Sequence, residues 1–216
     1  EQQTDEPSLC TKEHKYFIGF RGRPRLPFPE FRSYFDAIAK RSKWTRNRLK
    51  IKFLGHQPFG TTALPAENQT TDSYYQLLTR CAFFLCPRGD NLYSYRLAEA
   101  LSAGAIPVIY ADGWVLPFTK TLVDWNDIAV LIRQEEVNQT LDILKALYKN
   151  KSIDNNGNHI TNNHNPKDRI CEMRRKGQEF YQNFVRNSTG RVNGIVRTMN
   201  ARLAGDVSTF QAVPGG

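Results

Sequence analysis

The stretch that decides the fold is Arg88–Ile109, which reads RGDNLYSYRLAEALSAGAIPVI. It predicts a loop, then a helix over 95–103, then a buried strand over 106–110. Ser94 is a good N-cap for the helix, and Gly104 stands where a left-handed C-terminal cap is expected. A loop, a helix and a strand in this order are typical of an α/β fold.

Charged residues of this unit gather where the loop meets the helix. An apolar strand predicted over 81–86 leads into the loop. A loop between the carboxyl end of a strand and a helix N-terminus is where open α/β sheets bind phosphate. Arg96 can neutralise a diphosphate, and Glu99, one turn later, can accept hydrogen bonds from ribose hydroxyls. This chemistry indicates a nucleotide-sugar donor site. The alternative is an ordinary i,i+3 surface pair.

Strands and helices alternate along the rest of the chain. Strands are also predicted over 15–20, 49–54 and 128–132, helices over 29–42, 72–78, 137–148 and 167–186, and a long Asn-rich loop over 150–166. This alternation favours an α/β, Rossmann-like, doubly wound parallel sheet. Because the carboxyl ends of parallel strands share one edge, we expect Arg21, Arg88, Asp112 and the start of the 95–103 helix to converge there.

The length of 216 residues suits one well-buried domain rather than two. We expect a disordered N-terminal segment over 1–14, a Rossmann-like donor-binding domain over 15–186 and a helical or irregular tail over 187–216. The chain begins at Glu1 instead of Met. We therefore expect a partial sequence, with a targeting or anchor segment upstream.

The net charge of +9 favours an anionic partner. Nucleic acid, acidic glycan and nucleotide diphosphate all fit that charge. Basic residues crowd the first quarter of the chain, but no aromatic ladder or nucleic-acid motif accompanies them. We therefore predict no nucleic-acid partner, and keep a nucleic-acid-binding domain only as a third hypothesis.

Four N-glycosylation sequons indicate the secretory lumen, at Asn68, Asn138, Asn150 and Asn187. Golgi or endoplasmic reticulum is the expected compartment, with the chain as part of a type II membrane protein. Cys81 and Cys86 lie on one predicted strand and are poorly placed to bridge each other, so buried free thiols are expected. A disulfide involving Cys10 or Cys171 stays open.

Other residues give weaker signals. No Asp-x-Asp motif offers ligands for a divalent metal, so neither a metal nor another cofactor is expected. Trp114 and Trp125 fit core anchors better than sugar-stacking platforms.

An ordered series of motifs resembles the exostosin family of glycosyltransferases. The matching elements are Cys86-Pro87-Arg88-Gly89, Ser94–Leu101, Ile106–Ile109, Asp112-Gly113-Trp114, Leu116-Pro117-Phe118, Asp124-Trp125-Asn126 and Ala129-Val130. The earlier Phe17–Gly22 is similar to the first strand and loop of that family's donor domain.

This resemblance implies an inverting enzyme with the GT-B fold, in which the C-terminal of two Rossmann-like domains binds a UDP-sugar. It implies that Arg96 contacts the diphosphate and Glu99 the ribose. It further implies that Arg88 and Gly89 shape the loop beside the phosphates, and that Asp112 and Gly113 lie near the sugar. The full set of predicted donor-binding residues is Arg21, Arg88, Gly89, Ser94, Arg96, Glu99, Asp112 and Gly113.

The sequence departs from the family pattern in two ways. Asp90-Asn91 replaces residues that look basic in the heparan-synthesising members, and Ala105 replaces a frequent cysteine. The 216 residues cannot hold both GT-B halves, so no general base is assigned, and a missing N-terminal domain or a second glycosyltransferase subunit is the expected partner. The leading hypothesis is transfer of a sugar from UDP to a glycan acceptor. The alternative is a non-catalytic glycan- or partner-binding module with the same fold.

Overall fold

The computed structural model of the chain describes residues 14–22, 29–41, 43–53, 71–89, 91–110, 112–149, 151–153, 159–161 and 166–205.

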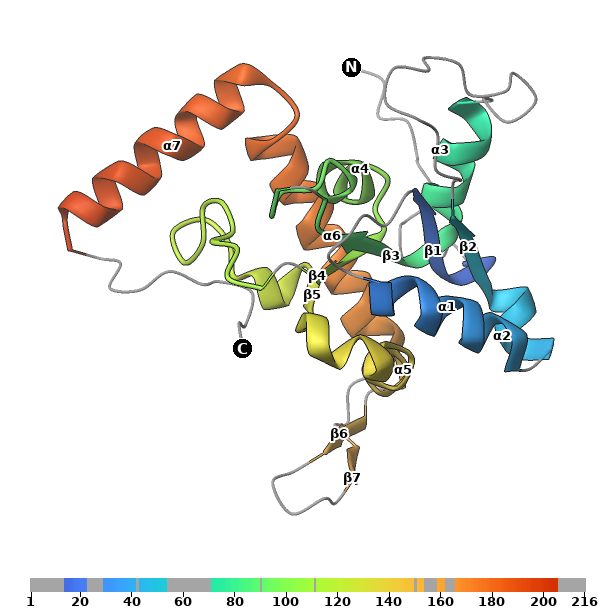
Figure 1. The fold of residues 1–216 in the computed structure, drawn as a ribbon. Helices are drawn as coiled ribbons and strands as arrows, with labels where there is room; N and C mark the ends of the chain where they lie inside the picture. Colours follow the sequence, from blue (N-terminus) through green and yellow to red (C-terminus); the bar gives the residue numbers. More distant parts are fainter. Residues whose placement is uncertain are drawn as a thin grey trace.

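A five-stranded parallel sheet forms the centre of the molecule (Figure 1). Its strands are β1 (Tyr16–Gly22), β2 (Leu49–Phe53), β3 (Cys81–Pro87), β4 (Ile106–Tyr110) and β5 (Val130–Leu131). They lie in the order β2-β1-β3-β4-β5, and each neighbouring pair is parallel. The predicted Rossmann-like parallel sheet is thereby confirmed. Every residue of the central β3 is buried, as expected for a strand covered on both faces.

Helices cover both faces of the sheet. They are α1 (Pro29–Arg41), α2 (Lys43–Arg48), α3 (Thr71–Arg80), α4 (Arg96–Ser102), α5 (Thr140–Tyr148), α6 (Pro166–Phe184) and α7 (Ser188–Leu203), with 3-10 turns η2 (Trp125–Asp127) and η3 (Gln134–Gln139). Side chains from α1 and α5 pack into one buried cluster, and those from α3 and α4 into the other. The long α6 contributes to both clusters.

The first cluster is rich in aromatic rings. Phe31 of α1 packs edge-on against Phe20 of β1 and Tyr110 of β4, with ring centroids 5.2 and 5.5 Å apart. Such rings bury large apolar areas and dominate the stability of a core. They hold α1 directly over the strands whose carboxyl ends carry the predicted site.

The α4 unit follows the predicted boundaries at its end but not at its start. Gly104 has φ +70, and the amides of Gly104 and Ala105 bond Leu101 O and Ala100 O, which is the expected left-handed cap. The prediction of Ser94 as a side-chain N-cap is wrong. The N-cap residue is Tyr95, whose backbone is already helical and which makes no side-chain cap, whereas a side-chain N-cap needs an extended residue at that position.

Four further features differ from the sequence prediction. Part of the expected 150–166 loop forms an antiparallel pair, β6 (Lys151–Ile153) with β7 (His159–Thr161). Asn156-Gly157, a strong hairpin signal, stands between these strands in the sequence. The predicted 128–132 strand is reduced to β5, and the predicted 137–148 helix begins as η3. Helix α2 had not been predicted.

Helix α7 lies apart from the sheet, beyond the end of α6 (Figure 1). Its inner face carries the buried Gly190, Gly194 and Thr198, and an added Cβ at Gly194 would lie 3.0 Å from the Phe118 ring. Its exposed apolar side chains are Val192, Ile195, Val196, Met199 and Leu203. None of the helices described here is long and apolar enough to cross a membrane.

The two cysteines of β3, Cys81 and Cys86, are buried free thiols, as predicted. Burial raises the pKa of both thiols above the usual range, which keeps them protonated and unreactive. Cys171 is disulfide-bonded, and Cys10 lies outside the described residues.

Candidate functional site: the carboxyl edge of the sheet

The strand order creates a switch point between β1 and β3. The chain leaves β1 toward α1 on one face, whereas it leaves β3 toward α4 on the opposite face. Two diverging connections leave a crevice outside the carboxyl ends of such strands, where open α/β sheets bind ligands. The site should therefore be sought where β1 and β3 end.

Arg96 spans this switch point. It is the first residue of α4, and its Nε donates a hydrogen bond to Arg21 O near the end of β1, at 3.2 Å. Its guanidinium also lies 5.3 Å from the Phe20 ring, a favourable cation–π distance. The half-buried guanidinium is thus fixed at the edge of the sheet, and its terminal nitrogens have no hydrogen-bond acceptor among the described residues.

Gly22, the last residue of β1, makes room for Arg96. A Cβ added there would lie 1.9 Å from one terminal nitrogen of Arg96 and 2.7 Å from its central carbon. Any larger residue would displace the guanidinium from this place. Gly22 was not among the predicted site residues, although it stands in the Phe17–Gly22 segment that resembles the family.

Glu99 lies one turn beyond Arg96 and is half-buried. The hydroxyl of Tyr74, from α3, donates a 2.5 Å hydrogen bond to Glu99 Oε2. Burial and the neighbouring Glu99 carboxylate raise the pKa of Tyr74 well above its usual range, so its hydroxyl keeps its proton. The Arg21 guanidinium lies 6.0 Å from the Tyr74 ring. Tyr74 therefore links the end of β1 to Glu99.

Tyr74 is the second site residue that sequence reasoning missed. It stands 25 residues before Glu99 on a different helix, so no local spacing could connect the two. Only the packing of α3 and α4 against the same face of the sheet brings them together.

The loop after β3 carries polar atoms that are buried without a partner. Arg88 donates its backbone N–H to Tyr110 O at 3.0 Å, but its side-chain Nε has no hydrogen-bond partner among the described residues. The Ser94 hydroxyl, in the same loop, also has no hydrogen-bond partner among the described residues, and Ser94 is only 5% exposed. Unpaired buried groups are rare in folded proteins and call for an explanation.

The glycines of the site differ in what they require. Gly113 has φ +75, a conformation that favours glycine, and is exposed. An added Cβ at Gly89 would meet no atom within 4 Å. Gly89 therefore has room for a side chain in the protein itself.

Asp112 follows β4 at the same edge, but its carboxylate is engaged within the fold. Both of its oxygens accept from the backbone N–H of Gln134, at 3.0 and 3.3 Å. This contact fixes the start of η3 to the end of β4. Its predicted place near the sugar stays a prediction.

The structure thus gathers Arg21, Arg96 and Glu99 into one connected group, with Tyr74 and Gly22 added. Arg88, Gly89, Ser94, Asp112 and Gly113 stand in the loops of the same edge. Two of the four sequons are described: Asn138 in η3 and Asn187 at the start of α7, both exposed. Asn68 and Asn150 lie outside the described residues. No group of three or more potential metal ligands occurs in the described part of the chain.

Comparison with known proteins identifies the family. Residues 7–147 match the model of the Exostosin GT47 domain. The chain is 33% identical over 143 residues to the probable glucuronoxylan glucuronosyltransferase IRX7 of Arabidopsis thaliana, covering 66% of this chain and 30% of that protein. It is 28% identical over 130 residues to an exostosin-1 homolog of Caenorhabditis elegans, covering 60% of this chain and 29% of the relative.

The matched part therefore spans less than a third of the length of these relatives. Among solved structures, the C-terminal domain of a group 1 family glycosyl transferase (LpcC) from Francisella tularensis aligns with a TM-score of 0.42 and 14% identity, over 79% of this chain and 86% of that domain. Since the family model covers residues 7–147, more than half of the sequence, the chain belongs to the exostosin GT47 family of glycosyltransferases.

Proposed function

We propose that the carboxyl edge of the sheet binds a UDP-sugar and that the chain supports inverting transfer of that sugar to a glycan acceptor. The observation that carries this proposal is the group at the switch point. Arg96 is fixed by its bond to Arg21 O, and Glu99 stands one turn away and is bonded to Tyr74. A cation beside a carboxylate at this spacing suits a diphosphate next to a ribose.

The diphosphate would take its charge-assisted hydrogen bonds from Arg96 and from the unpaired Nε of Arg88. Bonds between a guanidinium and a phosphate are short and strong, because the donor group is rigid and always charged. Glu99 would accept from the ribose hydroxyls through the oxygen that Tyr74 does not use. The site would thus bind the charged diphosphate at the arginines and the ribose hydroxyls at Glu99.

Transfer itself needs one bond formed and one broken. An acceptor hydroxyl oxygen would attack the anomeric carbon of the sugar while the bond from that carbon to the diphosphate oxygen breaks. The acceptor proton would pass to a base, and UDP would leave with the bonding electrons. Arg96 and Arg88 would stabilise the negative charge that develops on the diphosphate. We assign the base to the acceptor-binding half, supplied by a further domain or a second subunit.

Calorimetric titration of the chain with UDP tests the donor site. We expect saturable binding that Arg96→Ala weakens. Lys120→Ala removes an exposed cation far along the chain from Arg96 and serves as the matched control. Absence of detectable heat at millimolar UDP would remove the donor-site proposal.

A non-catalytic glycan- or partner-binding module with the same fold is the alternative proposal. Incubation of the purified chain with UDP-sugars and oligosaccharide acceptors separates the two proposals. Transfer by this chain alone would exclude the non-catalytic one. UDP binding without transfer would fit a donor domain that needs a partner.

We also propose that the protein resides in the lumen of the Golgi or endoplasmic reticulum. Asn138 and Asn187 are exposed and can accept a glycan. At Asn187, Oδ1 accepts from the Gly190 amide at 2.7 Å and caps α7, but an N-linked glycan attaches through the other side-chain atom, Nδ2. A mobility shift on digestion of the secreted chain with a peptide N-glycosidase would support this location. An unglycosylated product from a secretory host would count against it.

A further inference from the structure

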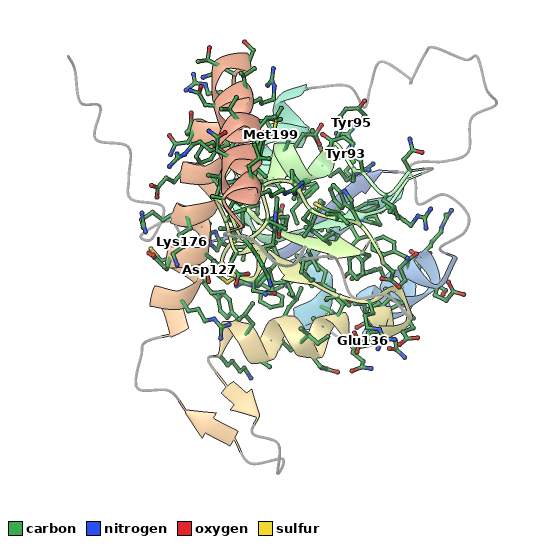
Figure 2. All side chains as sticks on the ribbon, turned by 90° about the vertical axis from the view of Figure 1, so that its left-hand side faces the viewer. Tyr93, Tyr95, Asp127, Glu136, Lys176 and Met199 are labelled. Atoms are coloured by element: carbon green, nitrogen blue, oxygen red, sulfur yellow. The ribbon has the colours of Figure 1, made fainter. Side chains whose placement is uncertain are left out.

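Three aromatic side chains meet at the surface beside the candidate donor site. Tyr93 packs edge-on against Tyr95 with ring centroids 5.1 Å apart, and against Trp114 at 5.8 Å. Tyr93 is 46% exposed and Tyr95 is 78% exposed. We name Tyr93, Tyr95 and Trp114 the aromatic cluster. Figure 2 shows the two tyrosines together at the outside of the molecule.

Two loops of the carboxyl edge build this cluster. Tyr93 and Tyr95 stand in the loop between β3 and α4, and Trp114 follows β4. Tyr95 directly precedes Arg96 in the chain. Burial, together with the nearby Tyr95 and Glu99, raises the pKa of Tyr93. The aromatic cluster therefore borders the candidate donor site.

The aromatic cluster lies at the border of the core, because Trp114 is partly buried and packs against the second buried cluster, whereas both tyrosines are exposed. Trp125, the other tryptophan of the family motifs, is completely buried and its indole N–H donates to Pro117 O at 3.0 Å. Trp114 is only half-buried, and its ring contact is with an exposed tyrosine. Edge-on packing of the rings stabilises their orientation, while the high exposure of Tyr95 leaves a large ring surface in contact with water.

The chemistry of this surface suits a sugar. A pyranose ring has an apolar face of C–H groups, which are attracted to the electron-rich face of an aromatic ring. Its edge carries hydroxyls, and a tyrosine hydroxyl can donate to or accept from them. We propose that Tyr93, Tyr95 and Trp114 form a stacking subsite for one pyranose ring of the glycan acceptor.

The acceptor fits this position better than the donor sugar. The donor sugar is tied to the diphosphate, whereas Tyr95, the most exposed ring of the cluster, has 78% of its surface in contact with solvent. An acceptor chain approaching from solvent would meet this ring first. The inference rests on the proposed function, because an acceptor must come close to the sugar that UDP carries.

Titration of the full chain with two oligosaccharides, followed by proton NMR, tests the subsite. The probes are xylohexaose, which is uncharged, and a heparosan hexasaccharide, in which alternate rings carry a carboxylate. Stacking moves sugar C–H signals upfield because of the aromatic ring current. We expect this shift with at least one probe, and the pair shows whether the favoured ring is neutral or acidic.

Variants locate the effect. Tyr95→Ala should weaken the affinity about five- to tenfold, as expected for the loss of one aromatic contact, while Tyr95→Phe retains most of it. Tyr75→Ala is the matched control, since Tyr75 is a 60% exposed tyrosine on α3. Equal loss in Tyr95→Ala and Tyr75→Ala would overturn the assignment.

A cavity elsewhere in the protein is an alternative binding place for the sugar, and the experiment can distinguish it from the aromatic cluster. A cavity of about 610 Å³ lies between α1 and η3, and its lining includes Tyr34 and Glu30. With tyrosine rings isotopically labelled, sugar-induced shifts confined to Tyr34 would overturn the proposal. Failure of both sugars in a chain that still binds UDP would overturn the subsite and leave the donor site standing. Sugar binding in a chain that does not bind UDP would overturn the donor site and leave the subsite standing.

Discussion

The two edges of the sheet both hold arginines, but they use them differently. At the amino edge, before β4, Arg174 of α6 is 3% exposed, and its Nε donates to Gly104 O. Its NH1 lies 2.7 Å from the ring nitrogen Nε2 of His14, which precedes β1. At the carboxyl edge, Arg96 donates a hydrogen bond from its Nε to Arg21 O and remains partly exposed.

This difference separates an arginine that serves the structure, Arg174, from Arg96, which we propose binds the diphosphate. Burial lowers the pKa of Arg174 to about 10, because removing a guanidinium from water disfavours its charge. The fold accepts this cost because Arg174 joins α6 to the turn before β4. Arg96 keeps access to water and can therefore exchange it for a phosphate. Both residues are arginines, so it is the burial and the hydrogen-bond partners of each side chain that distinguish Arg174 from Arg96.

The strongest test removes the structural arginine. Arg174→Ala leaves Gly104 O and the His14 ring without this donor, so we expect the free energy of unfolding to fall by about 3 kcal/mol. Urea unfolding followed by circular dichroism measures it. The affinity of the remaining folded protein for UDP should not change. Arg175→Ala is the control, because this neighbour is exposed and, within the described part of the chain, pairs only with Glu172 and Glu179 at the surface of α6.

Arg96→Ala should reverse this pattern. We expect UDP affinity to fall by about 1.5–3 kcal/mol, as for hydrogen bonds to a charged group, with little change in Tm. Calorimetry and thermal melting on the same samples measure both quantities. If the variant melts early and binds UDP normally, Arg96 is structural like Arg174, and the contrast between the two edges fails.

Two glycines of β1 test the same distinction between binding and stability, with smaller expected effects. Gly22→Ala would push a methyl group into the Arg96 guanidinium, which can move, so we expect UDP affinity to fall by about 1 kcal/mol with Tm retained. Gly19→Ala would place its Cβ 2.2 Å from the buried Cys81 sulfur. Overpacking there should cost about 1–3 kcal/mol of stability. Identical behaviour of both variants would show that Gly22 serves packing alone.

The α4 unit shows what a sequence can and cannot predict. Gly104 was predicted correctly because a left-handed cap depends on a local backbone conformation that favours glycine. Ser94 was predicted wrongly because the same loop can place the helix start one residue later, on Tyr95. The apolar strands β3 and β4 followed from composition, since both are buried throughout.

Contacts between distant segments lay beyond the sequence. The bond from Tyr74 to Glu99 depends on how α3 and α4 pack, and the space that Gly22 leaves for Arg96 depends on the register of β1 beside α4. Trp114 and Trp125 looked alike as motif residues. Only the fold shows that Trp125 is completely buried, whereas Trp114 packs at the border of the core and also contacts the exposed Tyr93.

Glu99 offers the smallest and most selective test of the carboxyl edge. Glu99→Gln keeps a carbonyl oxygen that can accept from Tyr74 or from a ribose hydroxyl, whereas Glu99→Ala keeps none. We expect UDP affinity to fall by about 0.5–1 kcal/mol in Glu99→Gln and by about 1.5 kcal/mol in Glu99→Ala. Tyr74→Phe serves as the companion variant, because it removes the donor and leaves the carboxylate in place. If Glu99→Gln and Glu99→Ala lower Tm equally and leave UDP affinity unchanged, Glu99 serves only to hold α3 against α4, and the ribose contact is excluded.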